Sequence, residues 1–221
     1  MALHMLQRSS THRVTGLLTT VTQGAGRVSI HGVRVELLRA QAAALGLPLD
    51  EVAIPAGAGN DAYEQAVGAA LRRHVATGVR TVAFGDLFLA DIRSYREAMV
   101  ARHGMAATFP VWGHDTRRFV GEFIALGCRG TLVCVDVQAL DESFAGRAID
   151  ADLLRDLPPE VDPCGENGEY HSFAHDGPMF GHPVAVAQGA RTMRDGFCFC
   201  DMVPGKPVVV TPTGIEPVFQ P

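Results

Sequence analysis

The sequence has no long apolar run, no excess of positive charge and no even, regularly spaced set of cysteines. Nothing in its 221 residues approaches the ~20 consecutive apolar residues that span a bilayer, and residues 1–12 lack the apolar core of a signal peptide. The net charge of −5 and the pI near 6.0 argue against a general nucleic-acid binder. We therefore expect a cytoplasmic protein with neither a membrane nor a nucleic acid as partner.

The composition also bears on disulfides, on the type of source genome and on the size of the core. Five scattered cysteines in a chain of this length do not favour a disulfide framework, so reduced thiols are expected. Lys206 is the only lysine, a bias towards arginine that is typical of GC-rich bacterial genomes. With 47% hydrophobic residues, the chain can bury a substantial core, as one large domain or a domain with a small appendage.

Short apolar runs alternate with longer segments of helical spacing over the first part of the chain. The runs are rich in β-branched or aromatic residues and predict strands at residues 14–21, 49–55, 79–86, 106–112 and 131–137. Apolar residues three and four apart predict helices at residues 1–8, 33–45, 63–75, 92–102 and 117–126. Because parallel strands need long crossovers, this alternation predicts an α/β fold with an open parallel sheet.

The pattern changes after residue 137. One short helix is predicted at residues 150–157, and strands at residues 182–190, 196–203 and 206–212 follow at the spacing of antiparallel neighbours. We expect a nucleotide-binding α/β domain over residues 1–139 and a small β-rich subdomain for substrate binding over residues 140–221.

Polar residues that follow the predicted parallel strands are candidates for ligand binding, because ligands of open α/β sheets lie at the carboxyl ends of strands. In the glycine-rich stretch after the first strand, His31, Gly32 and Arg34 could hold an anion or a purine edge. The stretch could equally be a turn with a helix cap. Gly85 and Asp86 could bind a ribose hydroxyl or a phosphate-bound metal, or cap the next helix.

Two arginines and a strand end extend this candidate surface. Arg93 and Arg96 lie three residues apart on one predicted helical face and could clamp a phosphate, although neighbouring acids or solvent could occupy them instead. The fourth strand ends in Trp112 and Gly113, which we include as candidate substrate-binding residues.

The densest group of polar residues lies at residues 162–180, DPCGENGEYHSFAHDGPMF. Glu166 and Glu169 bracket Asn167-Gly168, a strong hairpin-turn signal. A tight turn would place both carboxylates and His171 on adjoining strand ends, where they could bind an amine or act as general base. An exposed hairpin without function is the alternative.

The cysteines offer two weaker hypotheses. A zinc site could use residues from the set Cys164, His171, His175, Cys198 and Cys200. However, no CxxC pair is present and the thiols of Cys198 and Cys200 are expected to point apart, so we expect no metal site in this set. Cys164 is the best candidate for a nucleophilic cysteine, and an ordinary buried cysteine is its alternative.

Several segments together resemble the diphthine–ammonia ligase family, also described as adenine nucleotide alpha hydrolase-like or PP-loop ATP pyrophosphatases. The resemblance covers almost the whole chain, through GLLTTV, RVSIHGVR, LLRAQAAALGLPL, VAFGDLFLADIRSYRE, FPVWG and above all the segment at residues 162–180.

This resemblance implies a HUP-type, Rossmann-like domain that binds ATP, with Mg²⁺ implied. Such an enzyme adenylates a carboxylate with loss of pyrophosphate, and ammonia then displaces AMP to form an amide. Glu166, Glu169 and His171 would be catalytic in an acceptor pocket. The pocket's other substrate-binding residues would be Cys164, Gly165, Asn167, Gly168 and Tyr170, with Arg93, Arg96, Trp112 and Gly113. If the source is bacterial, the acceptor is expected to be a carboxylate other than diphthine, since diphthamide belongs to archaea and eukaryotes.

The family's phosphate-binding loop, serine-glycine-glycine-lysine-aspartate-serine, is not found in the sequence, and Met1-Ala2-Leu3-His4 matches the helix that follows it. Either the start is assigned too late, which we favour, or the truncation is real and ATP chemistry is impaired. Two function classes stay open: an ATP-dependent amide ligase and a non-catalytic protein that binds a nucleotide or small molecule. A metal-dependent hydrolase is a distant third, and a homodimer is one expectation for the assembly.

Overall fold

The computed structural model describes residues 1–29, 31–206, 208–211 and 214–217. Its elements, in chain order, are α1 (Ala2–Gln7), β1 (Leu17–Thr22), β2 (Arg27–Val28), α2 (Val35–Ala44), β3 (Leu49–Ile54), α3 (Asn60–Ala76), β4 (Thr81–Ala83), α4 (Ala90–Ala101), β5 (Ala106–Thr108), α5 (Thr116–Ala125), β6 (Arg129–Asp136), the 3₁₀ turn η1 (Glu142–Phe144), α6 (Ala151–Asp156), β7 (Tyr170–Asp176), β8 (Val186–Arg194), β9 (Phe197–Pro204), β10 (Val208–Thr211) and β11 (Gly214–Pro217).

Most predicted elements are present, and local chemistry explains where several begin. The Asp115 carboxylate accepts a hydrogen bond from the Arg118 N–H at the start of α5, and Asp150 does the same for Leu153 at the start of α6. Each predicted helix and each predicted strand up to residue 203 overlaps an observed one. The last predicted strand, 206–212, overlaps β10, but its residues 207 and 212 lie outside the described part.

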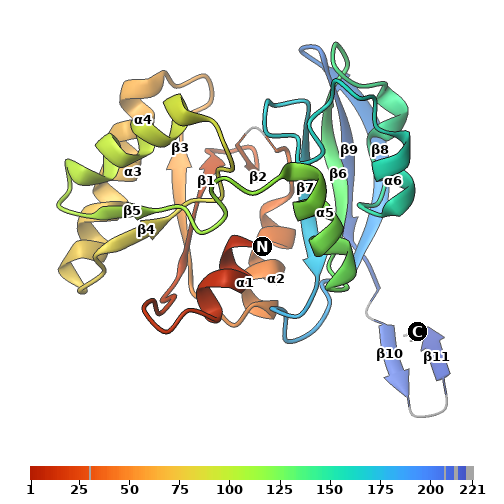
Figure 1. Cartoon of the computed structure of the whole chain (residues 1–221), viewed down its shortest axis with the longest axis horizontal. Helices are drawn as coiled ribbons and strands as arrows, with labels where there is room; N and C mark the ends of the chain where they lie inside the picture. Colours follow the sequence, from red (N-terminus) through yellow and green to blue (C-terminus); the bar gives the residue numbers. More distant parts are fainter. Residues whose placement is uncertain (30, 207, 212–213, 218–221) are drawn as a thin grey trace.

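The strands form several small sheets within a mixed α/β fold. β1 pairs in parallel with β3 and, at its end, antiparallel with β2, while β4 and β5 form a separate parallel pair. A four-stranded antiparallel sheet has the order β7-β6-β9-β8, and β10 pairs with β11. Figure 1 shows β4, β5, α3 and α4 at one end of the molecule and the four-stranded sheet at the other.

The strand predicted at residues 131–137 was assigned to the parallel sheet, and that assignment is wrong. It forms β6, which pairs antiparallel with both β7 and β9. A continuous apolar strand is expected wherever both faces of a sheet are covered, so its composition does not reveal the direction of its neighbours.

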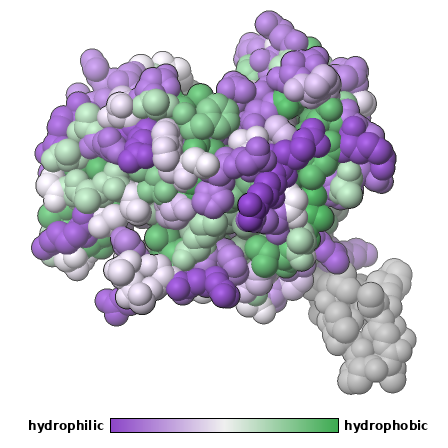
Figure 2. Space-filling view, in the orientation of Figure 1, coloured by the Kyte–Doolittle hydropathy of each residue, from purple (hydrophilic) through white to green (hydrophobic). Residues whose placement is uncertain are grey.

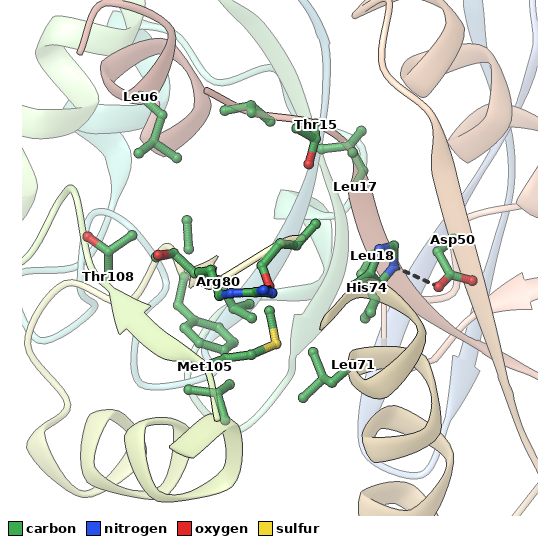
Figure 3. Close-up of a pocket in the computed structure, with 18 of the residues that line it drawn as sticks. Leu6, Thr15, Leu17, Leu18, Asp50, Leu71, His74, Arg80, Met105 and Thr108 are labelled. Atoms are coloured by element: carbon green, nitrogen blue, oxygen red, sulfur yellow. Dashed lines mark hydrogen bonds and ion pairs between the residues drawn. The ribbon is translucent and has the colours of Figure 1, made fainter. Parts of the chain in front are cut away.

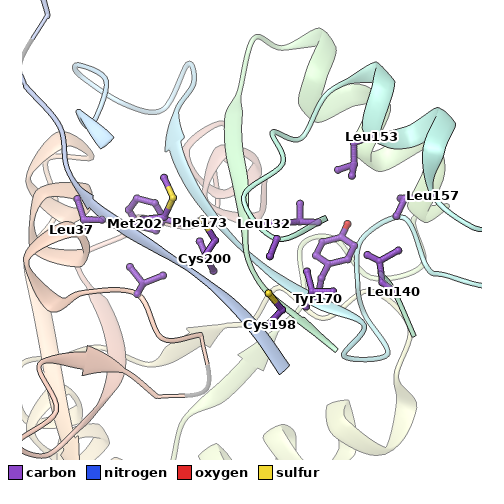
Figure 4. Close-up of a cluster of buried hydrophobic side chains, with 14 of the residues drawn as sticks. Leu37, Leu132, Leu140, Leu153, Leu157, Tyr170, Phe173, Cys198, Cys200 and Met202 are labelled. Carbon is purple, nitrogen blue, oxygen red and sulfur yellow. The ribbon is translucent and has the colours of Figure 1, made fainter. Parts of the chain in front are cut away.

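Two hydrophobic cores hold these sheets and helices together. The larger lies on the four-stranded sheet and includes Leu132, Tyr170 and Cys198 of that sheet together with Leu37 of α2 and Leu153 of α6 (Figure 4). The smaller packs α3 and α4 against β3 and includes Val52, Val67 and Met99. The larger core draws residues from both sides of the domain boundary expected between residues 139 and 140. That domain boundary stays a prediction.

The outer surface mixes polar and apolar residues, and Figure 2 shows the two kinds interspersed over one face. Within the described residues, no helix is both long and apolar enough to cross a membrane.

Candidate functional site

The loop from residue 162 to residue 169 is built by two of its own carboxylates. Asp162 Oδ2 accepts hydrogen bonds from the backbone N–H groups of Cys164 (3.1 Å) and Glu166 (3.0 Å). Glu169, only 7% exposed, accepts from the N–H of Asp162 (2.9 Å) and from the backbone N–H and side-chain amide of Asn167 (3.0 Å each). These bonds close the loop on itself and hold Glu166 in place.

The predicted hairpin across Asn167-Gly168 is wrong. The stretch between α6 and β7 consists of turns and contains no strand, and β7 begins only at Tyr170, where it pairs with β6. Glu166 and Glu169 therefore belong to one loop, because the asparagine-glycine signal is overridden by the hydrogen bonds that Glu169 makes within the loop. Glu169 has a structural role in this geometry, and its catalytic role stays a prediction.

Glu166 connects this loop to the end of β4. Its Oε1 accepts a hydrogen bond from the backbone N–H of Leu87 at 2.7 Å. Burial raises the pKa of Glu166, and the nearby carboxylates of Asp86 and Asp162 add to that increase. A half-buried carboxylate with a raised pKa can take up a proton near neutral pH more readily than an exposed one, as a general base requires.

Asp86 lies beside Glu166 and is 9% exposed. Arg96 Nε donates to Asp86 Oδ1 at 3.0 Å and lies 2.8 Å from Oδ2, while its guanidinium lies 4.8 Å from the centre of the Phe84 ring. Among the described residues, Asp86 Oδ2 has no partner in hydrogen-bond geometry, although Arg96 pairs with it in charge. A buried oxygen with unused capacity is a candidate acceptor or ligand.

Arg93, one turn before Arg96, is held by aromatic rings. Its guanidinium lies 4.9 Å from the centre of the Phe109 ring and 4.6 Å from that of Trp112, and its Nε pairs with Glu97 at 2.8 Å. The backbone N–H of Gly113 donates to the Leu87 carbonyl at 2.8 Å, which ties the end of this aromatic group to the loop after β4. Arg93, Arg96, Trp112 and Gly113 thus lie around the carboxyl ends of β4 and β5.

A cavity of about 400 Å³ opens between β4, α5 and β7. Its lining includes Gly85 and Leu87 from the loop after β4, Cys164 and Glu166 from the loop at residues 162–169, and Tyr170 from β7. Apolar residues of α1 and α5 form much of the remaining wall. The structure therefore brings together one predicted nucleotide-binding residue and three predicted catalytic or substrate-binding residues.

Cys164 does not fit the role of a nucleophile. Its thiol donates to the Thr116 carbonyl at 3.4 Å, and burial, with the carboxylates of Asp162 and Glu166, raises its pKa to about 12. A thiol with such a pKa is not ionised near neutral pH. The next residue, Gly165, has a φ of +67°, and a Cβ atom on it would lie 2.7 Å from the Tyr170 carbonyl oxygen. This position therefore has no room for a side chain.

His171 lies on the other side of β7 from this cavity. Tyr170 and Ser172 line the cavity, so His171, between them in the strand, points to the opposite face, where its ring centre lies 4.4 Å from that of His31. Burial lowers the pKa of both histidines, and burial together with His171 lowers that of His31 to about 4. The expectation that His171 adjoins Glu166 is wrong, because side chains alternate along a strand.

The glycine-rich stretch after β1 is anchored on β9. Asp201 accepts from Arg27 (2.8 Å) and from two nitrogens of Arg34 (2.6 and 3.1 Å), and these bonds lower its pKa to about 2. Gly32 has a φ of +70°, and a Cβ atom on it would lie only 2.9 Å from the Phe199 ring. His31, Gly32 and Arg34 thus contact the four-stranded sheet, while Gly85 lines the cavity and Asp86 follows it in the loop after β4, so the predicted nucleotide-binding set is divided.

Sequence reasoning missed three residues of this arrangement. Asp162 carried a signal, as the first residue of the polar segment, but Asp201 and the backbone N–H of Leu87 carried none. Both act through contacts with residues remote in sequence: 167 positions separate Asp201 from Arg34, and 79 separate Leu87 from Glu166.

The metal hypothesis receives no support from side-chain clustering. Cys198 and Cys200 are both buried in the larger core, on the same face of β9, so the expectation that they point apart is wrong, since residues two apart in a strand share a face. In the part of the chain that the structure describes, no group of three or more histidine, cysteine or acidic side chains could hold a metal ion.

Comparison with known protein families gives one match. Residues 115–206 match the family described as the diphthamide synthase C-terminal domain. The matched region contains α5, the loop that carries Glu166, and all four strands of the four-stranded sheet. A comparison with curated proteins found no match.

Proposed function

We propose that the chain is a diphthine–ammonia ligase-like, ATP-dependent amide ligase, because its residues 115–206 match the diphthamide synthase C-terminal domain. The reaction joins a carboxylate to ammonia and converts ATP to AMP and pyrophosphate. The observation that carries the proposal is the hydrogen bond from Leu87 N–H to Glu166, which joins the matched domain to the end of β4 at a cavity.

The nucleotide side of the proposed site lies at the carboxyl ends of the parallel strands. Ligands of open α/β sheets bind there, and Gly85 and Asp86 lie in the loop after β4, one residue beyond its end. We propose that β3, β1, β4 and β5 are parts of one HUP-type sheet with ATP across these ends. Arg93 and Arg96 would then face the phosphates or the acceptor.

Asp86 fits an Mg²⁺ ion that accompanies ATP. Mg²⁺ prefers carboxylate oxygens, and Asp86 Oδ2 is a buried oxygen that pairs in charge with Arg96 at 2.8 Å but has no hydrogen bond among the described residues. The ion would reduce the negative charge of the phosphates. Arg96 would hold the Asp86 carboxylate in position through its bond to Oδ1.

The acceptor side is the 400 Å³ cavity with Glu166 in its wall. Ammonia is mostly protonated near neutral pH, so a base must remove a proton before or during its attack on an activated carbonyl. Glu166, whose pKa is raised by burial, would take this proton on Oε2, because Oε1 already accepts from Leu87. The apolar wall would exclude water, which would otherwise hydrolyse the activated acceptor.

AMP formation tests this proposal. The chain is incubated with ATP, Mg²⁺, ammonium and a panel of small carboxylates, and AMP is measured with and without ammonium. We expect ammonium-dependent AMP with at least one acceptor, and Glu166→Gln to lower its rate by about 10²- to 10⁴-fold, the usual contribution of a general base. The matched control, Glu160→Gln, changes an exposed glutamate and should leave the rate unchanged.

Calorimetric titration with ATP and AMP separates the two function classes. Binding of either nucleotide without AMP formation would support the non-catalytic alternative. An unchanged rate in Glu166→Gln would refute the role of Glu166, because glutamine still accepts the Leu87 hydrogen bond but cannot take up the proton.

A further inference from the structure

The cavity beside Glu166 has a mostly apolar wall. Its aliphatic and aromatic lining residues include Leu3, Val111, Phe119, Val120, Phe123 and Ile149. Leu87 and Val111 are only 3% and 1% exposed, so this part of the wall belongs to the buried interior. The volume of about 400 Å³ exceeds the ~150 Å³ of an apolar cavity that holds benzene. An aliphatic chain or an aromatic ring therefore has room in this cavity.

Two polar side chains of the wall are engaged with other partners. The Tyr170 hydroxyl donates to the Pro163 carbonyl, and the Cys164 thiol donates to the Thr116 carbonyl at 3.4 Å. Because each of these groups has one hydrogen to donate, neither can donate to a ligand without giving up its partner. A hydroxyl or carboxylate placed beside them would lose its water without a replacement.

Charge on the wall is confined to one side chain. Among the described residues that line the cavity, none is an arginine, a lysine or a histidine, and Glu166 is the one acidic residue. Glu166 Oε1 accepts from Leu87 N–H at 2.7 Å, which leaves Oε2 for a ligand. The remaining polar side chain of the wall, Ser172, is exposed. The wall thus offers no cationic side chain to a negative group.

We infer that the acceptor taken up by this cavity is a carboxylic acid whose body is apolar and carries no second charge, such as a medium-chain aliphatic or phenyl-substituted acid. This inference rests on the proposed ligase function and names its substrate class. The reacting carboxylate would lie towards Gly85, where the cavity adjoins the loop after β4. The apolar body would lie against Val120 and Phe123 of α5.

A second charge of either sign on the acceptor is unfavourable here. A second carboxylate would lose its water, would meet no cationic side chain and would be repelled by Glu166. An ammonium group would pair with Glu166 Oε2, the oxygen that the proposed reaction needs for ammonia. The cavity therefore selects its acceptor by excluding charge.

The larger cavity, of about 1190 Å³ between β1 and β4, has a different wall (Figure 3). Asp50, His74 and Arg80 are among its lining residues, and Figure 3 shows the hydrogen bond between His74 and Asp50. An acid that carries a second charge could bind to such groups. Leu71 and Met105 line the larger cavity and not the smaller one, so their signals report separately on binding there.

Binding of matched six-carbon acids to the full chain tests the inference without ATP. Hexanoate, hexanedioate and 6-aminohexanoate have the same length and differ only in the group at the far end. Methyl NMR gives each Kd from the signals of Val120 and Ile149, with Leu71 and Met105 as controls. We expect the Kd of hexanoate to be at least about tenfold lower than that of either charged acid, and to rise about fourfold for each methylene removed, in pentanoate and butanoate.

A variant that fills the cavity locates the binding. Ala174→Leu should raise the Kd of hexanoate at least about tenfold, while the matched control Ala187→Leu, at an exposed alanine of β8, should leave it unchanged. If Ala174→Leu does not fold, the series of chain lengths still decides. Equal binding of the three six-carbon acids, tighter binding of a charged one, or shifts confined to Leu71 and Met105 would overturn the inference. Absence of hexanoate binding, both with and without ATP, would overturn it as well.

AMP formation separates this inference from the proposed function. Ammonium-dependent AMP with hexanedioate or 6-aminohexanoate, but not with hexanoate, would overturn the inference and leave the ligase function standing. Hexanoate binding at Val120 and Ile149 without AMP formation would support the apolar acid site and count against the ligase function.

Discussion

Replacing Glu169 by alanine is expected to unfold the loop that carries Glu166. The Glu169 carboxylate is 7% exposed and accepts three hydrogen bonds, two from the backbone N–H groups of Asp162 and Asn167 and one from the Asn167 side chain. Alanine would remove all three acceptors and leave two backbone donors without partners in a largely buried place.

The size of the effect follows from these contacts. Hydrogen bonds to a charged group contribute about 1.5–3 kcal/mol each, and a buried donor left unpaired costs about 1–3 kcal/mol. Because the bonds share one side chain they do not add, and water will reach part of the opened loop. We expect Glu169→Ala to lower the free energy of unfolding by about 3–5 kcal/mol. For a chain of this length, that corresponds to a fall in Tm of about 6–20 °C.

Urea unfolding at pH 7 with circular dichroism measures this change, and amide exchange at Asn167 localises it. Glu160→Ala is the matched control, since Glu160 is exposed and its loss should change stability by less than about 0.5 kcal/mol. If Glu169→Ala were as stable as the control while amide formation was lost, Glu169 would act on substrate and the structural role assigned to it would be refuted.

Three further predictions concern the contacts of the glycine-rich stretch with β7 and β9. Gly32→Ala should lower the free energy of unfolding, measured in urea, by about 2–4 kcal/mol. The control Gly24→Ala, where φ is a similar +75° but the space around the residue is open, should lower it by only about 1 kcal/mol, and equal losses would exclude the clash with Phe199. His31 should titrate near pH 4 by NMR, and a midpoint near 6.5 would contradict its burial. Because its folded pKa lies below its unfolded value, the protein should lose stability as pH falls from about 6.5 to 4, and His31→Gln should lose less over the same range. Asp201, with a folded pKa of about 2, should contribute about 2 kcal/mol to the free energy of unfolding above pH 4, and this contribution should be lost as pH falls towards 2. Asp201→Asn should therefore be less stable at pH 7, and its free energy of unfolding should change less with pH below pH 4. An unchanged pH dependence in this range would contradict the pairing with Arg34.

Local patterns predicted the elements well because their causes are local. The apolar spacing of residues 63–75 is that of a helix with one buried face, and α3 buries Val67, Ala70 and Leu71 as that spacing requires. The strand at residues 49–55 was similarly predicted from its own composition and appears as β3.

Strand pairing was predicted less well, because it depends on residues far away in the chain. β6 has the composition of a strand covered on both faces, and only its partners β7 and β9 decide that it is antiparallel. The asparagine-glycine signal was misleading for a related reason: Glu169 supplies acceptors for the loop's backbone donors, and these outweigh the preference of two residues for a hairpin turn.

The sequence by itself determined the alternation of helices and strands and the density of polar groups at residues 162–180, because periodicity and turn chemistry act over a few residues. Only the tertiary structure decided how those polar groups divide. Glu166 meets the end of β4 at a cavity, Glu169 holds the loop, and His171 turns to His31. Side chains alternate along a strand, and contacts across the chain select which face each one meets, so a cluster in sequence became three separate environments in space.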